Sequence, residues 1–154
     1  MSSQAVDGLI AAALSGEHEA FAECCAVDVH YEDPLSQGAL TGLYSLAEHA
    51  AALRRSFVDV RIDRSGPELA DDGHVAAPLR LQGVHAESLG QFPATGKPVT
   101  VQAILLAEVQ PDGRLRRIRV FFDLYDSGRQ LGLLPKPGSA AERAMLLARG
   151  FGLR

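Results

Sequence analysis

The stretch G-R-L-R-R-I-R-V-F-F-D-L-Y-D-S-G-R-Q-L-G-L-L-P, Gly113 to Pro135, decides how this chain folds. Its first half predicts a β-strand, because two kinds of side chain alternate along it. The apolar set is Ile118, Val120 and Phe122. The second set is Arg117, Arg119, Phe121 and Asp123. If the second face lines a cavity, Asp123 is a carboxylate among apolar neighbours, where its pKa rises and it can exchange protons near neutral pH. A solvated charged face is the alternative.

A tight turn precedes this strand. Pro111-Asp112-Gly113 is the clearest hairpin signal in the chain, and the segment before it, 99–109, alternates as a long strand. The quoted stretch is therefore the return arm of a hairpin. A short helical turn at 126–131, ended by Gly132, is expected to follow it.

The rest of the chain groups helices early and strands late. Apolar periodicity and composition predict further helices at 5–14, 17–25, 43–55 and 140–148. Alternation predicts further strands at 27–31, 57–64 and 74–85. This order is typical of an α+β fold in which about three N-terminal helices pack on a curved antiparallel or mixed sheet and enclose a pocket.

The length of 154 residues predicts one domain over 1–154, in which residues from about 138 form a C-terminal helical tail. Hydrophobic residues make up 47% of the chain, so a packed core is expected rather than disorder. The tail could lie free or pack on a partner subunit.

Composition argues against several classes of partner. A net charge of −4 offers no basic surface that would hold nucleic acid. No apolar run is long enough to span a bilayer, and the first residues do not resemble a secretion leader. We therefore expect no membrane contact and a cytoplasmic location.

The cysteines and histidines do not predict a metal site. Cys24 and Cys25 are adjacent, where a disulfide rarely has good geometry, and no Cys-x-x-Cys spacing exists. The 5 histidines are scattered, without a helical His-x-x-x-His pair. We expect both cysteines to be small core residues and the protein to need no metal.

Several short motifs, taken in order over about residues 5–135, resemble the SnoaL-like polyketide cyclases of the NTF2-like superfamily. The motifs are Tyr31-Glu32-Asp33-Pro34, Gly83-Val84-His85, Pro93-Ala94-Thr95-Gly96-Lys97-Pro98, Gly113-Arg114-Leu115, Phe121-Phe122-Asp123 and Gln130-Leu131-Gly132. The resemblance implies a cone-shaped α+β fold, which in this superfamily carries many different functions.

The resemblance also implies a cofactor-independent acid/base enzyme that acts on a polyketide-type intermediate. In the cyclases, an Asp at the place of Asp123 removes the proton next to a carbonyl, and the enolate then attacks a second carbonyl. An apolar pocket would raise the pKa of such a base to the useful range. The alternative for Asp123 is a structural carboxylate that caps the following turn.

Arg119 departs from the family pattern, since many relatives carry His-Trp where this chain has Ile118-Arg119. A nearby cation lowers the pKa of a carboxyl group and can stabilise an enolate or alkoxide. We therefore take Arg119 as a catalytic candidate, with a salt bridge to Asp123 or to another sheet residue as the alternative. Epoxide hydrolysis by paired Asp and Arg groups, or isomerisation, stays open, and Arg61 and Asp63 form such a pair if they are not solvated.

Five more residues complete the candidate site. His85 is a third catalytic candidate, although a histidine at a strand end also serves as a loop anchor. The predicted substrate-binding residues are Tyr31, Asp33, Phe121 and Gln102. Tyr31 and Asp33 share a strand face, and a turn cap is the alternative for Asp33, which precedes a proline.

The apolar strip of Ile118, Val120 and Phe122 is expected to lie on the outer face of the sheet and to meet a partner. Because NTF2-like proteins often dimerise through the sheet, the resemblance implies a homodimer. The remaining alternative to an enzyme is a module that only binds a small apolar molecule.

Overall fold

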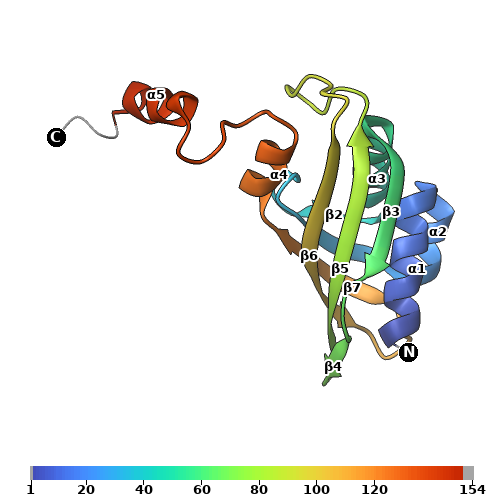
Figure 1. Ribbon diagram of the computed structural model, residues 1–154. Helices are drawn as coiled ribbons and strands as arrows, with labels where there is room; N and C mark the ends of the chain where they lie inside the picture. Colours follow the sequence, from blue (N-terminus) through green and yellow to red (C-terminus); the bar gives the residue numbers. More distant parts are fainter. Residues whose placement is uncertain (1, 151–154) are drawn as a thin grey trace.

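A computed structural model describes residues 2–150 of the chain (Figure 1). It contains helices where the sequence predicts them. They are α1 (Ser2–Ser15), α2 (His18–Cys24), α3 (Leu43–Ser56), α4 (Leu124–Gln130) and α5 (Ala140–Ala148). Within the described residues, no helix is both long enough and apolar enough to cross a membrane.

The strands include the five that alternation predicts and two short additional ones. They are β1 (Cys25–Glu32), β2 (Leu40–Thr41), β3 (Phe57–Arg64), β4 (Leu69–Asp71), β5 (His74–His85), β6 (Pro98–Val109) and β7 (Leu115–Phe122). β2 and β4 have 2 and 3 residues, which is too short for an alternating pattern to be detected.

The strands form one mixed sheet in the order β2-β1-β7-β6-β5-β3, with β4 paired to β5. β5, β6 and β7 are antiparallel neighbours, whereas β1 lies parallel to β7. The predicted α+β class is therefore confirmed. β1, β5 and β7 run in the same direction, so their C-terminal ends meet at one edge of the sheet. Asp33, His85 and Asp123 lie at these ends.

The turn at Pro111-Asp112-Gly113 joins β6 to β7, as predicted. Gly113 has a φ of 86°, in the left-handed region that glycine adopts without steric cost. Its N–H donates to the Gln110 carbonyl at 2.8 Å, and the N–H of Gln110 donates to the Arg114 carbonyl at 2.8 Å. The turn fixes the register of the central hairpin.

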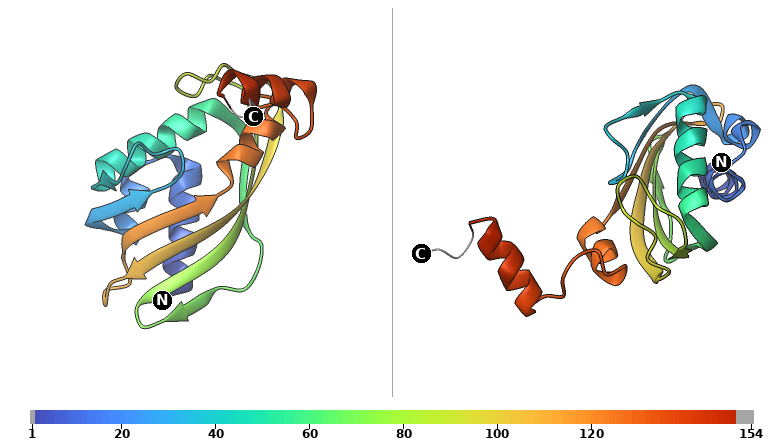
Figure 2. Two further views of the ribbon diagram at one scale, coloured as in Figure 1. Left: turned by 90° about the vertical axis from the view of Figure 1, so that its left-hand side faces the viewer. Right: turned by 90° about the horizontal axis from the view of Figure 1, so that it is seen from above.

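Helices α1, α2 and α3 cover one face of the curved sheet (Figure 2). Val6 and Phe21 from the first two helices join Val75 and Ile118 from the sheet in one core, and each is 0–1% exposed. Cys24 and Cys25 are free and buried, as predicted. The helical stripes and the inner face of the sheet exclude water together, and this burial stabilises the fold.

The face of β7 that looks inward is the opposite of the expected one. Ile118 is fully buried and Val120 packs against the core, whereas Arg119 is exposed and Phe121 is 50% exposed. The alternation is confirmed, but the prediction that the charged face lines a cavity is wrong, as is the prediction of an outer apolar strip at Ile118. The helices bring apolar stripes that only the apolar face can match, while burying Arg117 and Arg119 would desolvate two cations.

A bulge shifts the phase of β3. The register with β5 changes between Val58 and Arg61, and Asp59 has a φ of 53°. As a result Val58 is 46% exposed, although Val60 and Ile62 line a cavity. The sequence places these three residues on one face; the bulge turns Val58 outward.

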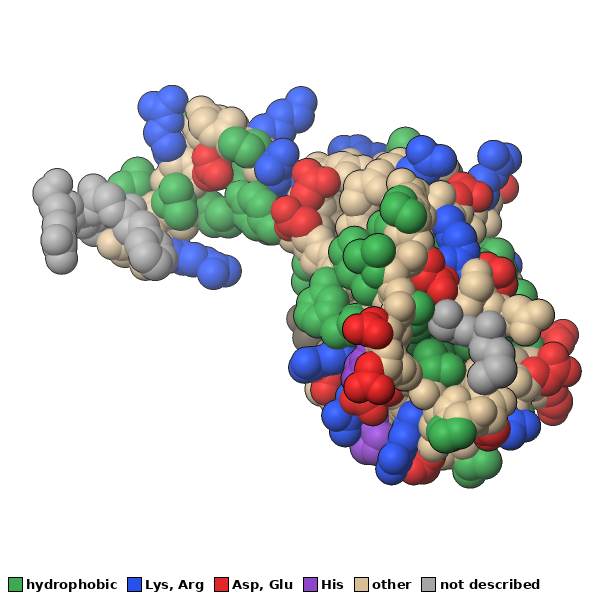
Figure 3. All heavy atoms as spheres, turned by 90° about the horizontal axis from the view of Figure 1, so that it is seen from below, with side chains coloured by type: hydrophobic (Ala, Val, Ile, Leu, Met, Phe, Trp, Pro, Cys, Tyr) green, Lys and Arg blue, Asp and Glu red, His purple; other side chains and the backbone are tan. Residues whose placement is uncertain are grey.

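Helix α5 stands away from the body, on the side of the sheet opposite α1–α3 (Figures 1 and 2). It has no buried residue, and Leu146 and Leu147 are 40% and 50% exposed. Hydrophobic side chains are uncovered along this projecting arm (Figure 3). Residues 151–154 of the predicted tail lie outside the described residues.

Candidate active site

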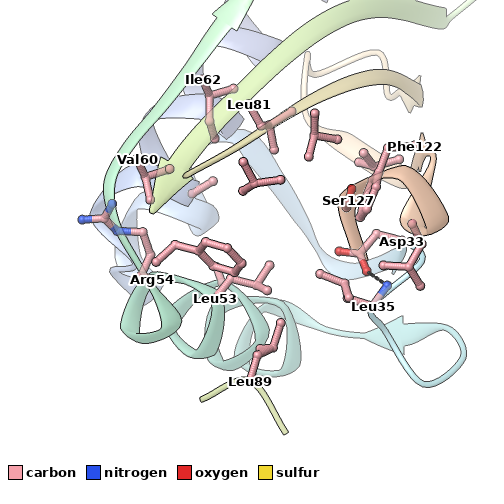
Figure 4. A pocket seen from close by; sticks show the side chains of 18 of the residues that line it. Asp33, Leu35, Leu53, Arg54, Val60, Ile62, Leu81, Leu89, Phe122 and Ser127 are labelled. Carbon is pink, nitrogen blue, oxygen red and sulfur yellow. Dashed lines mark hydrogen bonds between the residues drawn. The ribbon is translucent and has the colours of Figure 1, made fainter. Parts of the chain in front are cut away.

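A cavity of about 550 Å³ lies between the inner face of the sheet and the helices. Its wall is mostly aliphatic and aromatic. Apolar lining residues include Leu9, Phe21, Leu46, Leu53, Phe57, Val60, Ile62, Leu81, Leu89, Val99, Phe122, Leu133 and Leu134. In Figure 4, Asp33, Phe122 and Ser127 lie across the cavity from Leu53 and Val60. An apolar cavity of this size suits a small organic ligand.

Asp33 is the charged centre of one wall. Its Oδ2 accepts from the Tyr31 hydroxyl at 2.8 Å and lies 2.7 Å from Nε2 of His49. Its Oδ1 accepts from the backbone N–H groups of Leu35 and Ser36, each at 2.7 Å. The side chain is only 3% exposed, so these donors take the place of water.

The surroundings of Asp33 decide its ionisation. Burial raises the pKa of its carboxyl group, but hydrogen bonds from His49, Tyr31 and Leu35 and the charge of His49 outweigh burial and lower the pKa below its usual value. Burial, and then the negative charge of Asp33, raise the pKa of Tyr31 well above 10.0. Asp33 is therefore a carboxylate at neutral pH, and Tyr31 stays protonated and donates to it.

His49 comes from α3 and was not among the predicted site residues. It lies on the same helical face as Leu46, Ala50 and Leu53, which all line the cavity. Because Asp33 only accepts, Nε2 of His49 carries the proton of their shared bond. Nδ1 has no hydrogen-bond partner among the described residues, and His49 lines the cavity. A histidine within an apolar helical stripe was the signal in the sequence.

His85 lies at the end of β5 and lines the same cavity. It is 1% exposed, and its ring stacks on Phe57 with a centroid distance of 5.1 Å. Nδ1 is 3.2 Å from the Thr95 hydroxyl oxygen, whereas Nε2 has no partner in the described structure. The backbone of His85 bonds Gly96 and Lys97, so the residue also anchors the following loop.

Asp123 does not line the cavity. It is exposed and caps α4, where its Oδ1 accepts from the N–H of Asp126 at 2.9 Å. This is the structural alternative that the sequence left open. The expected burial of Asp123 is wrong, because the chain leaves β7 and begins α4 at this residue.

The other predicted residues of that face lie on the outside of the sheet. Arg119 forms an exposed ion pair with Glu32, with N–O distances of 2.9 and 3.1 Å. Phe121 and Gln102 are exposed, and neither lines the cavity. The proposed epoxide-opening pair, Arg61 and Asp63, is exposed as well. Of the predicted residues, Tyr31, Asp33 and His85 therefore share the cavity.

Within residues 2–150, no group of three or more His, Cys, Asp or Glu side chains is arranged to hold a metal ion. The polar side chains that line the cavity include Tyr31, Asp33, His49 and His85, which can form hydrogen bonds and transfer protons. A histidine paired with a buried carboxylate is an arrangement suited to a general base.

Comparisons with known proteins agree with this fold. No curated protein matches the chain. A candidate SnoaL-like polyketide cyclase from Jannaschia sp. CCS1 is 18% identical with a TM-score of 0.76, over 87% of this chain and 93% of that one. IdmH from Streptomyces antibioticus, a candidate polyketide cyclase, is 21% identical with a TM-score of 0.72, over 86% and 99%.

A protein of ketosteroid isomerase-like fold from Catenulispora acidiphila is 18% identical with a TM-score of 0.71, over 88% of this chain and 96% of that one. These similarities show the NTF2-like fold. The family model described as SnoaL-like polyketide cyclase matches residues 3–131, which is most of the chain. The protein therefore belongs to the SnoaL-like polyketide cyclase family.

Proposed function

We propose that the protein is a cofactor-independent acid/base enzyme that closes a ring in a polyketide-type intermediate. The observation that carries this proposal is the Asp33–His49 pair in the wall of a mostly apolar cavity, with a 2.7 Å contact between Oδ2 and Nε2. Family membership supports the substrate class.

In the proposed reaction, His49 is the base. Its free Nδ1 removes a proton from a carbon next to a carbonyl, and the resulting enolate carbon attacks a second carbonyl of the same molecule. The new alkoxide then takes the proton back from Nδ1. Bond making and proton transfer balance, so the aldol product is an isomer of the substrate and no oxidant, reductant or water is consumed.

Asp33 acts through His49 rather than as the base itself. Its lowered pKa and its four hydrogen-bond donors make it a weak proton acceptor at neutral pH. Its carboxylate fixes the Nε2–H tautomer of His49 and stabilises the imidazolium that forms when Nδ1 takes a proton. Tyr31 holds one of the carboxylate oxygens in place.

The apolar wall supports both the substrate class and the chemistry. A mostly hydrocarbon substrate buries its surface against residues such as Leu53, Val60 and Phe122. Exclusion of water protects the enolate from protonation by solvent before it reaches the second carbonyl.

The test compares two variants on candidate poly-β-ketone-derived substrates, with ring closure followed by liquid chromatography and mass spectrometry. His49→Gln removes the base but keeps a polar side chain, and we expect turnover to fall by about 100-fold or more. Asp123→Asn changes the carboxylate at the sequence-predicted position, and we expect turnover to stay within about threefold, because Asn caps a helix about as well as Asp.

A larger loss of turnover in Asp123→Asn than in His49→Gln would reject His49 as the base and support Asp123 in that role. Product mass separates the other candidate reactions. Epoxide hydrolysis adds one water, which oxygen-labelled water reveals, whereas ring closure and isomerisation add nothing. If the protein binds a candidate substrate but forms no product, it is a binding module rather than an enzyme.

We also propose that two copies associate through the outer face of the sheet. With Ile118 inside, the exposed apolar residues of β6 and β7 on that face are Ile104, Leu106 and Phe121, which are 40–50% exposed. Ile104 and Phe121 are direct partners across β6 and β7, so they form one continuous patch. Exposed patches of this kind usually meet a partner.

A further inference from the structure

We infer, building on the proposed function, that His85 binds a carbonyl oxygen of the substrate through Nε2, at a position separate from the base His49. The ligand class that this position selects is an apolar ketone. The inference begins with an atom that has no partner: Nε2 of His85 is fully buried and makes no hydrogen bond in the described structure.

An unpaired buried nitrogen is costly. Leaving such a group without a partner destabilises the folded state, and folded proteins keep few of them. His85 lines the cavity, but the surrounding side chains cover Nε2 itself. A bound ligand therefore supplies the missing partner after a small shift of these side chains uncovers the nitrogen. Phe57, which stacks on the ring, carries only hydrocarbon and cannot supply it.

The ring of His85 is held in one orientation. Phe57 stacks on it at 5.1 Å with an interplanar angle of 28°. Its N–H donates to the Lys97 carbonyl at 2.9 Å, and its carbonyl accepts from Gly96 at 2.8 Å. A rigid ring with one free nitrogen is a preorganised site, which binds without the cost of ordering a side chain.

Thr95 determines which partner Nε2 takes. The Thr95 oxygen accepts from the Lys97 N–H at 3.4 Å and lies 3.2 Å from Nδ1 of His85, and we infer that its hydroxyl donates to Nδ1. With Nδ1 accepting, the neutral ring carries its proton on Nε2. Nε2 is therefore a donor, and a carbonyl oxygen, which only accepts, is its natural partner.

The topology separates this position from the base. Asp33 follows β1 and His85 ends β5, and these strands are three places apart in the sheet. At the usual spacing this is about 14 Å along the sheet. A substrate that reaches both positions needs a body of several rings or an equally long chain, with its carbonyl at the His85 end and its acidic C–H near His49.

The first test uses the intact protein. 1-Tetralone and tetralin share a bicyclic hydrocarbon body, and only 1-tetralone has a carbonyl. In nitrogen-15 spectra of the histidine rings, we expect 1-tetralone to shift the Nε2 resonance of His85 and tetralin to leave it nearly unchanged. A response that is equal for the two probes, or no binding of either probe, would overturn the inference.

The second test is a double-mutant cycle between protein and probe. His85→Phe keeps a flat ring on Phe57 and removes Nε2. We expect the preference for 1-tetralone over tetralin to fall by about threefold to tenfold in this variant, the range of one net hydrogen bond. Thr95→Val keeps the ring of His85 and removes the hydroxyl beside it. We expect the spectra of this variant to show the tautomer protonated at Nδ1, and we expect the same preference to fall.

The two proposals fail in different ways. An unchanged preference in His85→Phe rejects the carbonyl site, whatever the turnover of His49→Gln. Full turnover of His49→Gln rejects the base, but it leaves the probe preference of His85 intact, because neither probe needs His49 to bind.

Discussion

Asp33 is a buried carboxylate that belongs to the candidate active site and also affects the stability of the fold. Its side chain is 3% exposed, and its hydrogen bonds and His49 keep its pKa below the usual value despite burial. A carboxyl group whose folded pKa is depressed stabilises the fold above its unfolded pKa, near pH 4, and loses that contribution as the pH falls through the folded pKa.

We therefore expect Asp33→Asn to lower the free energy of unfolding by about 1–3 kcal/mol at pH 7, because the buried donors lose a charged acceptor. The difference from the unmodified protein should shrink as the pH falls below about 4 toward the lowered pKa of folded Asp33, because the unfolded chain takes up its proton first. Urea unfolding at pH 7, 4 and 3 measures this. Asp123→Asn is the matched control, with an expected change below about 0.5 kcal/mol at pH 7. A difference independent of pH would contradict the expectation.

The same residue marks what sequence alone could predict. Tyr31 lies in β1 and Asp33 comes directly after this strand, so the contact between two residues this close in sequence follows from local geometry. His49 lies 16 residues beyond Asp33, and only the packing of α3 on the sheet brings them together. Spacing along the chain does not contain this contact, and the apolar stripe of α3 would place His49 only on the buried face of that helix.

At the scale of an element, β7 shows the limit of periodicity. Alternation predicts two faces but not which of them is inside, since that depends on the helices that cover the sheet. The bounds of some elements could be predicted from the sequence because strong local signals set them. β3, β5 and α5 have the predicted bounds, and the turn at 111–113 fixes the hairpin. The bulge at Asp59 had no such signal.

Adjacent positions of β7 test the face assignment. We expect Ile118→Ala to lower the free energy of unfolding by about 2–5 kcal/mol, because Ile118 is fully buried and its loss leaves a cavity. Arg119→Ala removes an exposed ion pair with Glu32 and should cost about 1 kcal/mol or less. Urea unfolding of both variants gives the ranking. A larger loss in Arg119→Ala would mean that the faces are assigned in reverse.

At the scale of the whole molecule, the outer face of the sheet is the proposed dimer interface. We expect light scattering at micromolar concentration to give twice the 16.4 kDa mass of one chain. Ile104→Asp places a charge in the patch and should give the mass of a single chain, because burying an unpaired charge is costly. Tyr44→Asp is the control, since Tyr44 is 72% exposed on α3 and should leave the mass unchanged. A single-chain mass for the unmodified protein would reject the interface.

Part of the cavity wall belongs to neither the sheet nor a helix. Leu133 and Leu134 line it, yet they follow the matched family region, which ends at residue 131. This connection makes no strand pairing, so its length and side chains can change without disturbing any register of the hairpin. Selection for a new substrate can therefore act on this segment while the Asp33–His49 pair and the sheet stay as they are, and a protein shortened at residue 131 would keep the pair but lose part of its specificity.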